Sequence, residues 1–125
     1  ETTRLAAARS LCMLGRPEGR AAAEKLLGSA ERTERRDGIR LIEGLRQTWA
    51  TAALAKLLGD PERPVQLAAA VALARAGDGR GPQWLAVTAE QADPEARLQL
   101  EGAIEQIGLT PADRKKILAA SKAAK

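Results

Sequence analysis

The sequence contains no histidine, no tyrosine and no phenylalanine, and it has a single cysteine, Cys12. Histidine, cysteine and tyrosine are among the side chains that most often act as nucleophiles or as acids and bases near neutral pH. The first two also supply the nitrogen and sulfur ligands of most zinc sites. We therefore expect a protein that is not an enzyme and that binds no metal or cofactor.

A lone cysteine also excludes a disulfide framework, which favours a reducing compartment, and we expect a cytoplasmic protein. Cys12 stands between Leu11 and Met13 in an apolar run, where we expect a buried structural thiol rather than a reactive one. No apolar segment approaches the roughly 20 residues of a membrane span, and no signal peptide is visible. The chain starts at Glu1, not methionine, so we expect a piece of a longer protein in preference to a processed product.

Aromatic residues are limited to Trp49 and Trp84, and the apolar content is mostly alanine. Such a core is thin and requires close approach of the backbones. Strong helix formers dominate the composition and β-branched residues are scarce, which predicts an all-α fold. The net charge is +4, with 14 arginines and 6 lysines spread among 16 acidic residues, so no charged tail is present.

Proline, glycine and capping residues divide the chain into eight expected helices. Gly15, Gly77 and Gly108 each follow an apolar stretch, and glycine just past a helix is a favoured stop. Asp93 and Thr110 stand where N-caps are expected, each followed by a proline suited to the first helical turn. The expected helices span residues 3–14, 18–27, 39–45, 52–58, 65–76, 82–89, 94–107 and 111–118.

The helix over 65–76 has the clearest pattern. Its apolar residues Val65, Ala69, Ala72, Leu73 and Ala76 follow the spacing i, i+4, i+7, i+8, i+11 of one helix face. The same pattern precedes two other glycines, which predicts a stack of similar helical units.

The glycines give the repeat period of these units. From Gly77 to Gly108 this period is about 31 residues, within the range of repeats that stack into solenoids. Gly15 and Gly77 are two such periods apart. In the second unit we expect Trp49 at the glycine position, after an insertion of three residues within 28–37. If the third helix, which forms around 39–45, includes Gly38 and Gly44 in its interior, each costs roughly 1 kcal/mol relative to alanine, and we expect the two glycines to mark close helix contacts. This register makes two sets of residues equivalent: Leu11, Leu45, Leu73 and Ile104, and Ala7, Leu41, Ala69 and Leu100.

The segment GDPERPVQLAAAVALARAGD resembles a HEAT-like repeat of the short type first described in phycobilisome lyases. Its matching residues are Asp60, Val65, Ala69, Ala72, Leu73, Gly77 and Asp78. Arg4 and Arg97 fall on that family's arginine position, whereas Gln66 and Gly38 depart from it. The resemblance implies an all-α, right-handed α-solenoid of about four antiparallel helix pairs, forming a single domain with units at about 1–28, 29–59, 60–92 and 93–122.

The resemblance also implies a function, since HEAT-like arrays serve mostly as binding surfaces. We expect a non-enzymatic protein-interaction or scaffolding module whose partner binds the concave face. In the family this face is usually lined by the second helix of each pair. The candidate partner-binding residues, with Glu24 beside them, are Arg16, Arg20, Lys56, Arg80, Gln83, Trp84, Arg114 and Lys115.

Two alternatives stay open. A nucleic-acid-binding array would use the basic side chains on phosphates, although acids alternate with them and no aromatic residues interleave for base stacking. The second alternative, that the chain is a chromophore lyase, rests on the family name alone, and we expect no pigment binding.

Three local features also have alternative interpretations. Trp84 either packs between units or is a partly exposed anchor for a partner, whereas Trp49 is expected to be structural. The glycine-rich stretch 77–81 lacks a preceding strand and a lysine, so we expect a helix–helix turn rather than a phosphate loop.

Overall fold

The structure, a computed structural model, describes residues 2–123, and within this range all regular secondary structure is helical, without a strand. This confirms the all-α class expected from the alanine- and leucine-rich composition. The elements are α1 (Thr2–Met13), α2 (Pro17–Leu27), α3 (Arg32–Ile42), α4 (Thr48–Lys56), the 3₁₀ turn η1 (Leu57–Gly59), α5 (Arg63–Arg75), α6 (Arg80–Gln91), α7 (Pro94–Gln106) and α8 (Pro111–Ala123).

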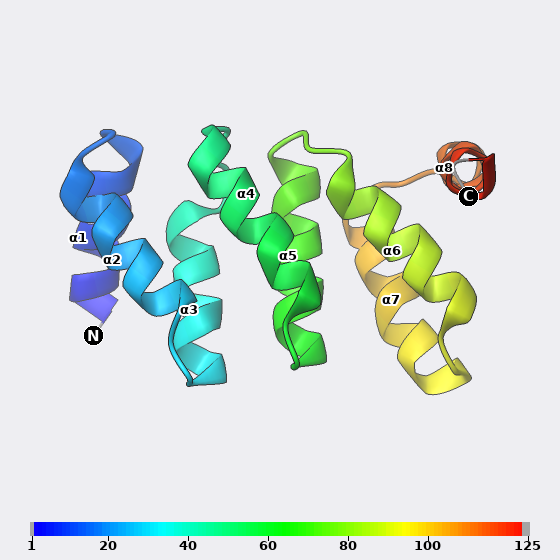
Figure 1. Cartoon of the computed structure of the whole chain (residues 1–125), viewed down its shortest axis with the longest axis horizontal. Helices are drawn as coiled ribbons and strands as arrows, with labels where there is room; N and C mark the ends of the chain where they lie inside the picture. Colours follow the sequence, from blue (N-terminus) through cyan, green and yellow to red (C-terminus); the bar gives the residue numbers. More distant parts are fainter. Residues whose placement is uncertain (1, 124–125) are drawn as a thin grey trace.

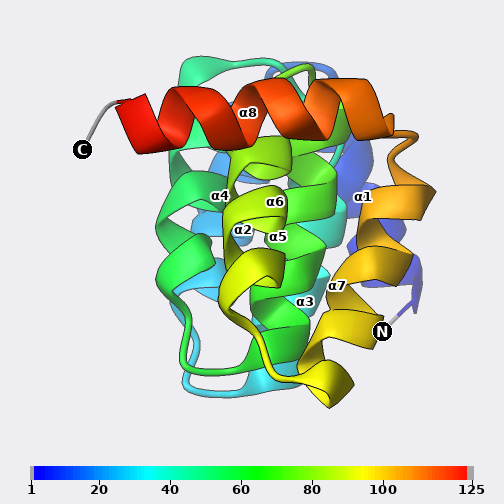
Figure 2. The ribbon, with the colours of Figure 1, turned by 90° about the vertical axis from the view of Figure 1, so that its right-hand side faces the viewer.

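Helices α1 to α7 run alternately up and down and form two layers (Figure 1). One layer contains α1, α3, α5 and α7, and the other contains α2, α4 and α6, as the end-on view in Figure 2 also shows. Within the first layer, α3 contacts α1 and α5, and α5 also contacts α7. The two layers face each other across an apolar interior made of two buried clusters.

Helix α5 is the centre of this interior. Its residues Val65, Ala69, Ala72 and Leu73 belong to a buried cluster that extends back to α1. Its residues 70 and 71 belong to a second buried cluster formed with α6 and α7. The strongly patterned helix of the sequence is therefore buried on more than one side, because its small alanine side chains admit neighbours closely.

Close approach of the helices depends on residues without a side chain. A Cβ added at Gly81 would collide with the backbone of α5, and one added at Gly19 would collide with the backbone of α1 around Cys12. At Gly38 it would lie 2.9 Å from side-chain atoms of Leu27. The expected close contact at Gly38 is therefore confirmed, and so is the thin core that the composition predicts.

The helix ends follow the expected capping chemistry. The Asp93 carboxylate accepts a hydrogen bond from the Ala96 N–H at 2.8 Å, and the Thr110 hydroxyl accepts one from the Asp113 N–H at 3.1 Å. Past α5, Gly77 adopts a φ of +80°, and the Asp78 N–H donates to the Leu73 carbonyl at 2.9 Å. This left-handed glycine closes the helix and satisfies a terminal carbonyl.

The expected register of the second unit is wrong. Trp49 lies inside α4, which begins at Thr48 instead of residue 52, so it does not replace a turn glycine. The turn is made by Gly44, with a φ of +88° and nothing within 4 Å of an added Cβ, so Gly44 marks no close contact. Glu43 is extended and the Leu45 N–H donates to the Ile42 carbonyl, as in a type II turn that requires glycine at its third position.

A buried ion pair joins α3 to the turn before α5. The Arg35 Nε donates to the Asp60 carboxylate at 2.7 Å, and the two side chains are only 11% and 4% exposed. The Arg35 Nη1 also donates to the carbonyls of Ser29 and Ala30, each at 3.0 Å. This arginine therefore holds the turns that precede α3 and α5 together.

Helix α8 departs from the expected fourth antiparallel pair. It lies across the end of the helix layers and packs on α6 (Figure 2). None of its residues, all of which the structure describes, is buried. The Arg114 guanidinium attaches it to α7 through two hydrogen bonds to the Glu101 carboxylate, at 2.5 and 2.7 Å.

Candidate functional site

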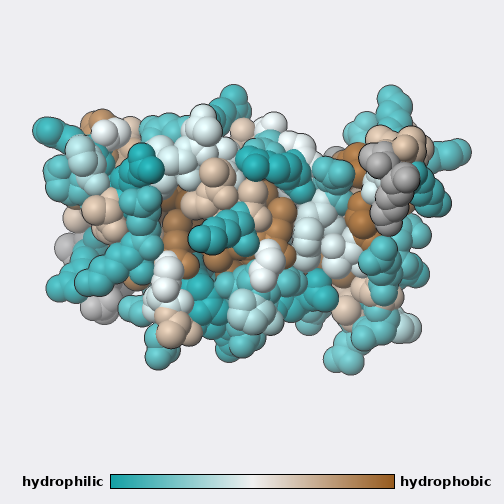
Figure 3. Space-filling model, viewed as in Figure 1, coloured by the Kyte–Doolittle hydropathy of each residue, from teal (hydrophilic) through white to brown (hydrophobic). Residues whose placement is uncertain are grey.

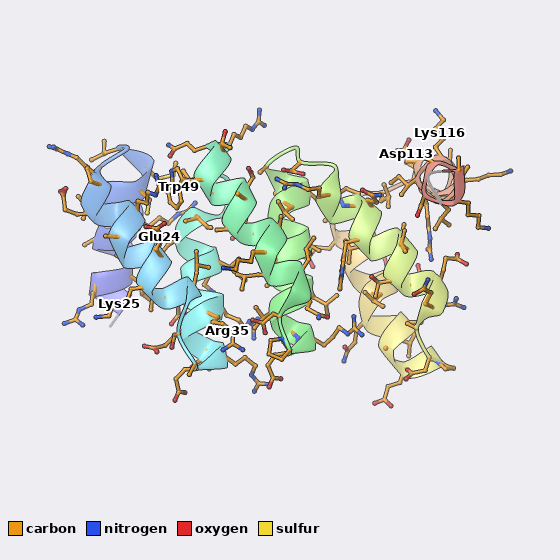
Figure 4. All side chains as sticks on the ribbon, in the orientation of Figure 1. Glu24, Lys25, Arg35, Trp49, Asp113 and Lys116 are labelled. Carbon is orange, nitrogen blue, oxygen red and sulfur yellow. The ribbon has the colours of Figure 1, made fainter. Side chains whose placement is uncertain are left out.

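The first group of candidate residues lies near the start of α2. Arg16 is exposed at the N-cap of α2, while Arg20 stacks over the Trp49 ring at 5.1 Å from its centroid. Arg20 also pairs with Glu24 at 3.5 Å. Figure 4 shows Trp49 and Glu24 at the gap between α2 and α4. Trp49 is half-buried against the core. The Arg20 guanidinium therefore contacts both a fixed aromatic ring and the Glu24 carboxylate.

The second group lies at the start of α6. Arg80 folds back onto Asp78, donating at 3.0 and 2.7 Å, and these bonds hold the pKa of the Asp78 carboxyl below its usual value. Gln83 is exposed. Trp84 is half-buried against the second core cluster, with the Arg63 guanidinium 5.8 Å from its ring centroid. The packing interpretation of Trp84 therefore holds for the part of the ring that lies against the core, and the anchor interpretation stays a prediction.

The remaining candidates lie elsewhere. Lys56 is the last residue of α4, at the opposite end of the α2, α4 and α6 layer from Arg16 and Arg80. On α8, Lys115 is exposed, whereas the Arg114 charge is neutralised by Glu101. The candidates on or beside α2, α4 and α6 therefore belong to one layer, whereas Arg114 and Lys115 lie on the crossing helix α8, and the eight do not form one continuous cluster. On the face that this layer presents, hydrophobic groups show between hydrophilic side chains over α2 and α4 (Figure 3).

An open depression lies on the layer of α1, α3, α5 and α7. We call it the basic groove: an open depression of about 840 Å³ formed by α3, α5 and α7. Its floor is apolar, with Ile39 of α3 and Leu67 and Val71 of α5. The residues that line it are Arg36, Ile39, Arg40, Glu43, Pro64, Leu67, Ala68, Val71, Arg75, Gln99, Gly102, Ala103 and Gln106.

Each helix contributes one stripe to the basic groove. The α5 stripe, from Pro64 to Arg75, forms the floor because its residues recur every three or four positions. Arg36 and Arg40, one turn apart on α3, form a basic rim, and Gln99 and Gln106 form an uncharged rim on α7. The arrangement suits binding of an elongated partner whose surface has both apolar and charged groups.

None of the groove residues is among the sequence candidates. In the sequence, Arg36 and Arg40 resemble ordinary solvent-exposed residues of a charged helix. The depth of the groove beside them depends on how far α5 is recessed between α3 and α7, which the local sequence does not show. The available signal was the spacing of Pro64, Leu67, Ala68 and Val71, which marks a second apolar stripe on α5 beside the buried one.

Among residues 2–123, no group of three or more His, Cys, Asp or Glu side chains is placed to hold a metal ion. No described helix is both long enough and apolar enough to cross a membrane. Burial raises the pKa of the Cys12 thiol, in line with the structural role expected for it. Comparison with protein-family models, with curated proteins and with solved structures finds no match to this chain.

Proposed function

We propose that the chain is a non-enzymatic module that binds a partner protein, built as a right-handed α-solenoid of HEAT-like helix pairs. The basic groove is the observation that carries the binding role. It is open, spans three helices and combines an apolar floor with one basic rim and one uncharged polar rim. Partner surfaces in protein complexes have the same composition, with an apolar centre and a polar periphery.

Equal spacing of buried positions supports the repeat architecture. Leu11, Ile42, Leu73 and Ile104 follow one another at the repeat period without any insertion, and the last three are buried. Gly19, Ala50 and Gly81 follow the same interval on α2, α4 and α6, and all three are buried. One period therefore relates packing positions on both helices of a pair, as stacked repeats require.

A polar position that recurs with the same spacing further supports the repeat architecture. Arg35 donates to the Ser29 carbonyl at 3.0 Å, and Gln66, one repeat period later, donates to the Asp60 carbonyl at 2.6 Å. Arg97, after one further period, donates to the Ala89 carbonyl at 2.9 Å. In each case a long polar side chain binds backbone carbonyls at the end of the preceding pair or in the turn that follows it.

The chemistry of the groove favours binding over catalysis. Its only carboxylate, on Glu43, is paired with Arg75 at 2.6 Å, and its other polar groups are arginines and amides. Such groups position a ligand but do not exchange protons near neutral pH. A nucleic-acid-binding array remains the second proposal, because Arg36 and Arg40 are both basic and exposed.

Selection of a displayed random-peptide library against the folded chain tests the protein-binding role. The recovered peptides are measured by fluorescence anisotropy against the wild type and two surface variants. One variant, Arg36→Glu with Arg40→Glu, alters the groove, and the other, Gln83→Glu with Trp84→Ala, alters the opposite layer. We expect the recovered peptides to bind the wild type more tightly than their scrambled versions do. Their affinity should fall in the groove variant and stay unchanged in the variant of the opposite layer.

A gel shift with random-sequence duplex DNA separates the two proposals. Binding of DNA that weakens steeply with salt, without any peptide that outperforms its scrambled version, would replace the protein-binding proposal by the nucleic-acid one. We expect no DNA shift at physiological salt.

A further inference from the structure

The basic groove has an imbalance of charge on one rim. Arg75 is neutralised by Glu43, but Arg40 has only Asp37 at 3.7 Å and its side chain is 70% exposed. Arg36 makes no ion pair with any other described residue. Two guanidinium groups, one turn apart on α3, therefore face the groove with their charge largely uncompensated.

A third arginine adds positive charge beside this rim. The Arg9 guanidinium, from α1, donates to the carbonyls of Arg40, Leu41 and Glu43 at 2.5, 3.3 and 3.1 Å. These carbonyls form the negative end of α3, where an acidic partner would otherwise be repelled. Arg9 thus cancels the unfavourable end of the helix and leaves the α3 rim attractive to carboxylates.

The floor and the far rim restrict the occupant further. Leu67 and Ala68, half-buried on the floor, favour apolar side chains, and Gln99 and Gln106 on α7 offer amides without charge. Nucleic acid would place phosphates over this apolar floor and near the Glu43 carboxylate, with no aromatic side chain lining the groove for its bases. An amphipathic polypeptide meets the floor and the α3 rim together.

We propose that the basic groove binds a short acidic amphipathic helix of a partner protein, lying along α5 with its acidic edge against α3. This inference rests on the proposed protein-binding function. The floor from Pro64 to Arg75 is about 17 Å long at the helical rise per residue, which corresponds to a partner helix of about 12 residues. Carboxylates at positions i and i+4 of that helix match the spacing of Arg36 and Arg40.

A defined probe tests this. The probe is a fluorescein-labelled helical peptide, of the length just given, with leucines at i, i+3, i+4 and i+7 on one face and glutamates at a separate pair of positions j and j+4 along the flank of that face. A second peptide carries lysine in place of each glutamate. Both are titrated against the wild type, the groove variant Arg36→Glu with Arg40→Glu, and a matched control, Lys25→Glu with Lys116→Glu. The control changes the net charge equally at two exposed positions outside the groove and outside the candidate partner-binding residues.

We expect the acidic peptide to bind the wild type and the control alike, and to bind the groove variant about tenfold or more weakly. The lysine peptide should not bind the wild type. Equal loss in both variants would show unspecific charge attraction and overturn the proposal, as would an unchanged affinity in the groove variant. Circular dichroism confirms that both variants remain helical.

Other occupants of the groove give distinct results. Duplex DNA that displaces the acidic peptide at a lower concentration than unlabelled peptide does would assign the groove to nucleic acid. Self-association in sedimentation that disappears in the groove variant would assign it to a second copy of this chain. If library-selected peptides bind but the acidic probe does not, the protein-binding function stands and the acidic-helix inference fails.

Discussion

Removal of Arg35 is expected to be among the most costly single changes to the fold. Its guanidinium makes two hydrogen bonds to Asp60, at 2.7 and 3.1 Å, and two to the carbonyls of Ser29 and Ala30. In the variant Arg35→Met, the Asp60 carboxylate stays almost fully buried and keeps only the Glu62 N–H, at 2.9 Å. Breaking a buried pair by removing one partner costs about 3–5 kcal/mol, because a charge is left without compensation.

A double-mutant cycle separates the pair from the packing around it. Asp60→Asn keeps the shape of the side chain and its acceptor for Glu62, while removing the charge. We expect each single variant to be destabilised, and the double variant Arg35→Met with Asp60→Asn to lose clearly less than the sum of the two. The reason is that neither buried charge remains unpaired in the double variant.

The assay is urea denaturation at pH 7, followed both by far-ultraviolet circular dichroism and by fluorescence of the two tryptophans. Coincident transitions establish that a single free energy of unfolding applies. The matched control is Arg32→Met, because Arg32 pairs with Glu62 between the same elements at 3.7 Å but is half exposed. We expect this control to lose less than about 1 kcal/mol. Strict additivity in the cycle, or equal losses for Arg32→Met and Arg35→Met, would refute the reasoning.

Further predictions concern packing, acid stability and thiol access. Gly81→Ala should lower the free energy of unfolding by about 1–3 kcal/mol through the collision of its Cβ with α5, whereas Gly102→Ala, with nothing within 4 Å, should raise it by about 0.5–1 kcal/mol; urea titration measures both. The hydrogen bonds from Arg114 hold the pKa of Glu101 below its ordinary 4.5, so the stability from this pair is complete above that value and is lost as the pH falls through the lower pKa of the folded state. Glu101→Gln should therefore cost less than about 1 kcal/mol at pH 7, because the carboxylate is partly exposed, and this cost should shrink as the pH is lowered below 4.5; a cost that stays constant or grows on acidification would contradict the assignment. Cys12, 2% exposed, should react with an aromatic disulfide reagent only after denaturation, and rapid labelling of the folded chain would contradict its burial.

Local chemistry predicts most of the helix boundaries. Asp93 and Thr110 cap the helices expected from them, and Gly77 closes α5 in the left-handed conformation. These signals act within a few residues of one another, so they do not depend on the rest of the fold. Burial of α5 was also predictable, because its small alanine side chains allow neighbouring helices to pack closely against it.

The register of the second unit was predicted wrongly for a physical reason. It was counted from turn glycines, and a turn can shift along the chain when it changes from a Schellman closure to a type II turn, as it does at Gly44. Packing positions shift less easily, because a shift turns every side chain away from its neighbours. Counted from buried residues, Ile42 replaces Leu45 as the equivalent of Leu73, and no insertion is needed.

The basic groove could not be read from the sequence in the same way. A groove depends on the relative depth of three helices that are far apart in the chain. Arg36 and Arg40 differ from other exposed arginines only in what lies beside them, namely Leu67 and Val71. The sequence supplies the stripes, and only the packing of α5 between α3 and α7 makes a groove of them.

The last helix shows where the repeat period stops predicting packing. Ala23, Leu54 and Leu85 follow that period on α2, α4 and α6, and all three are fully buried. The next position is Lys116, which is exposed and points away from the other helices (Figure 4). Burying a lysine charge there would cost far more than a leucine gains, so α8 cannot occupy the place of a fourth second helix. It lies across the end of the layers instead, with its contacts made by half-buried side chains and the ion pair from Arg114.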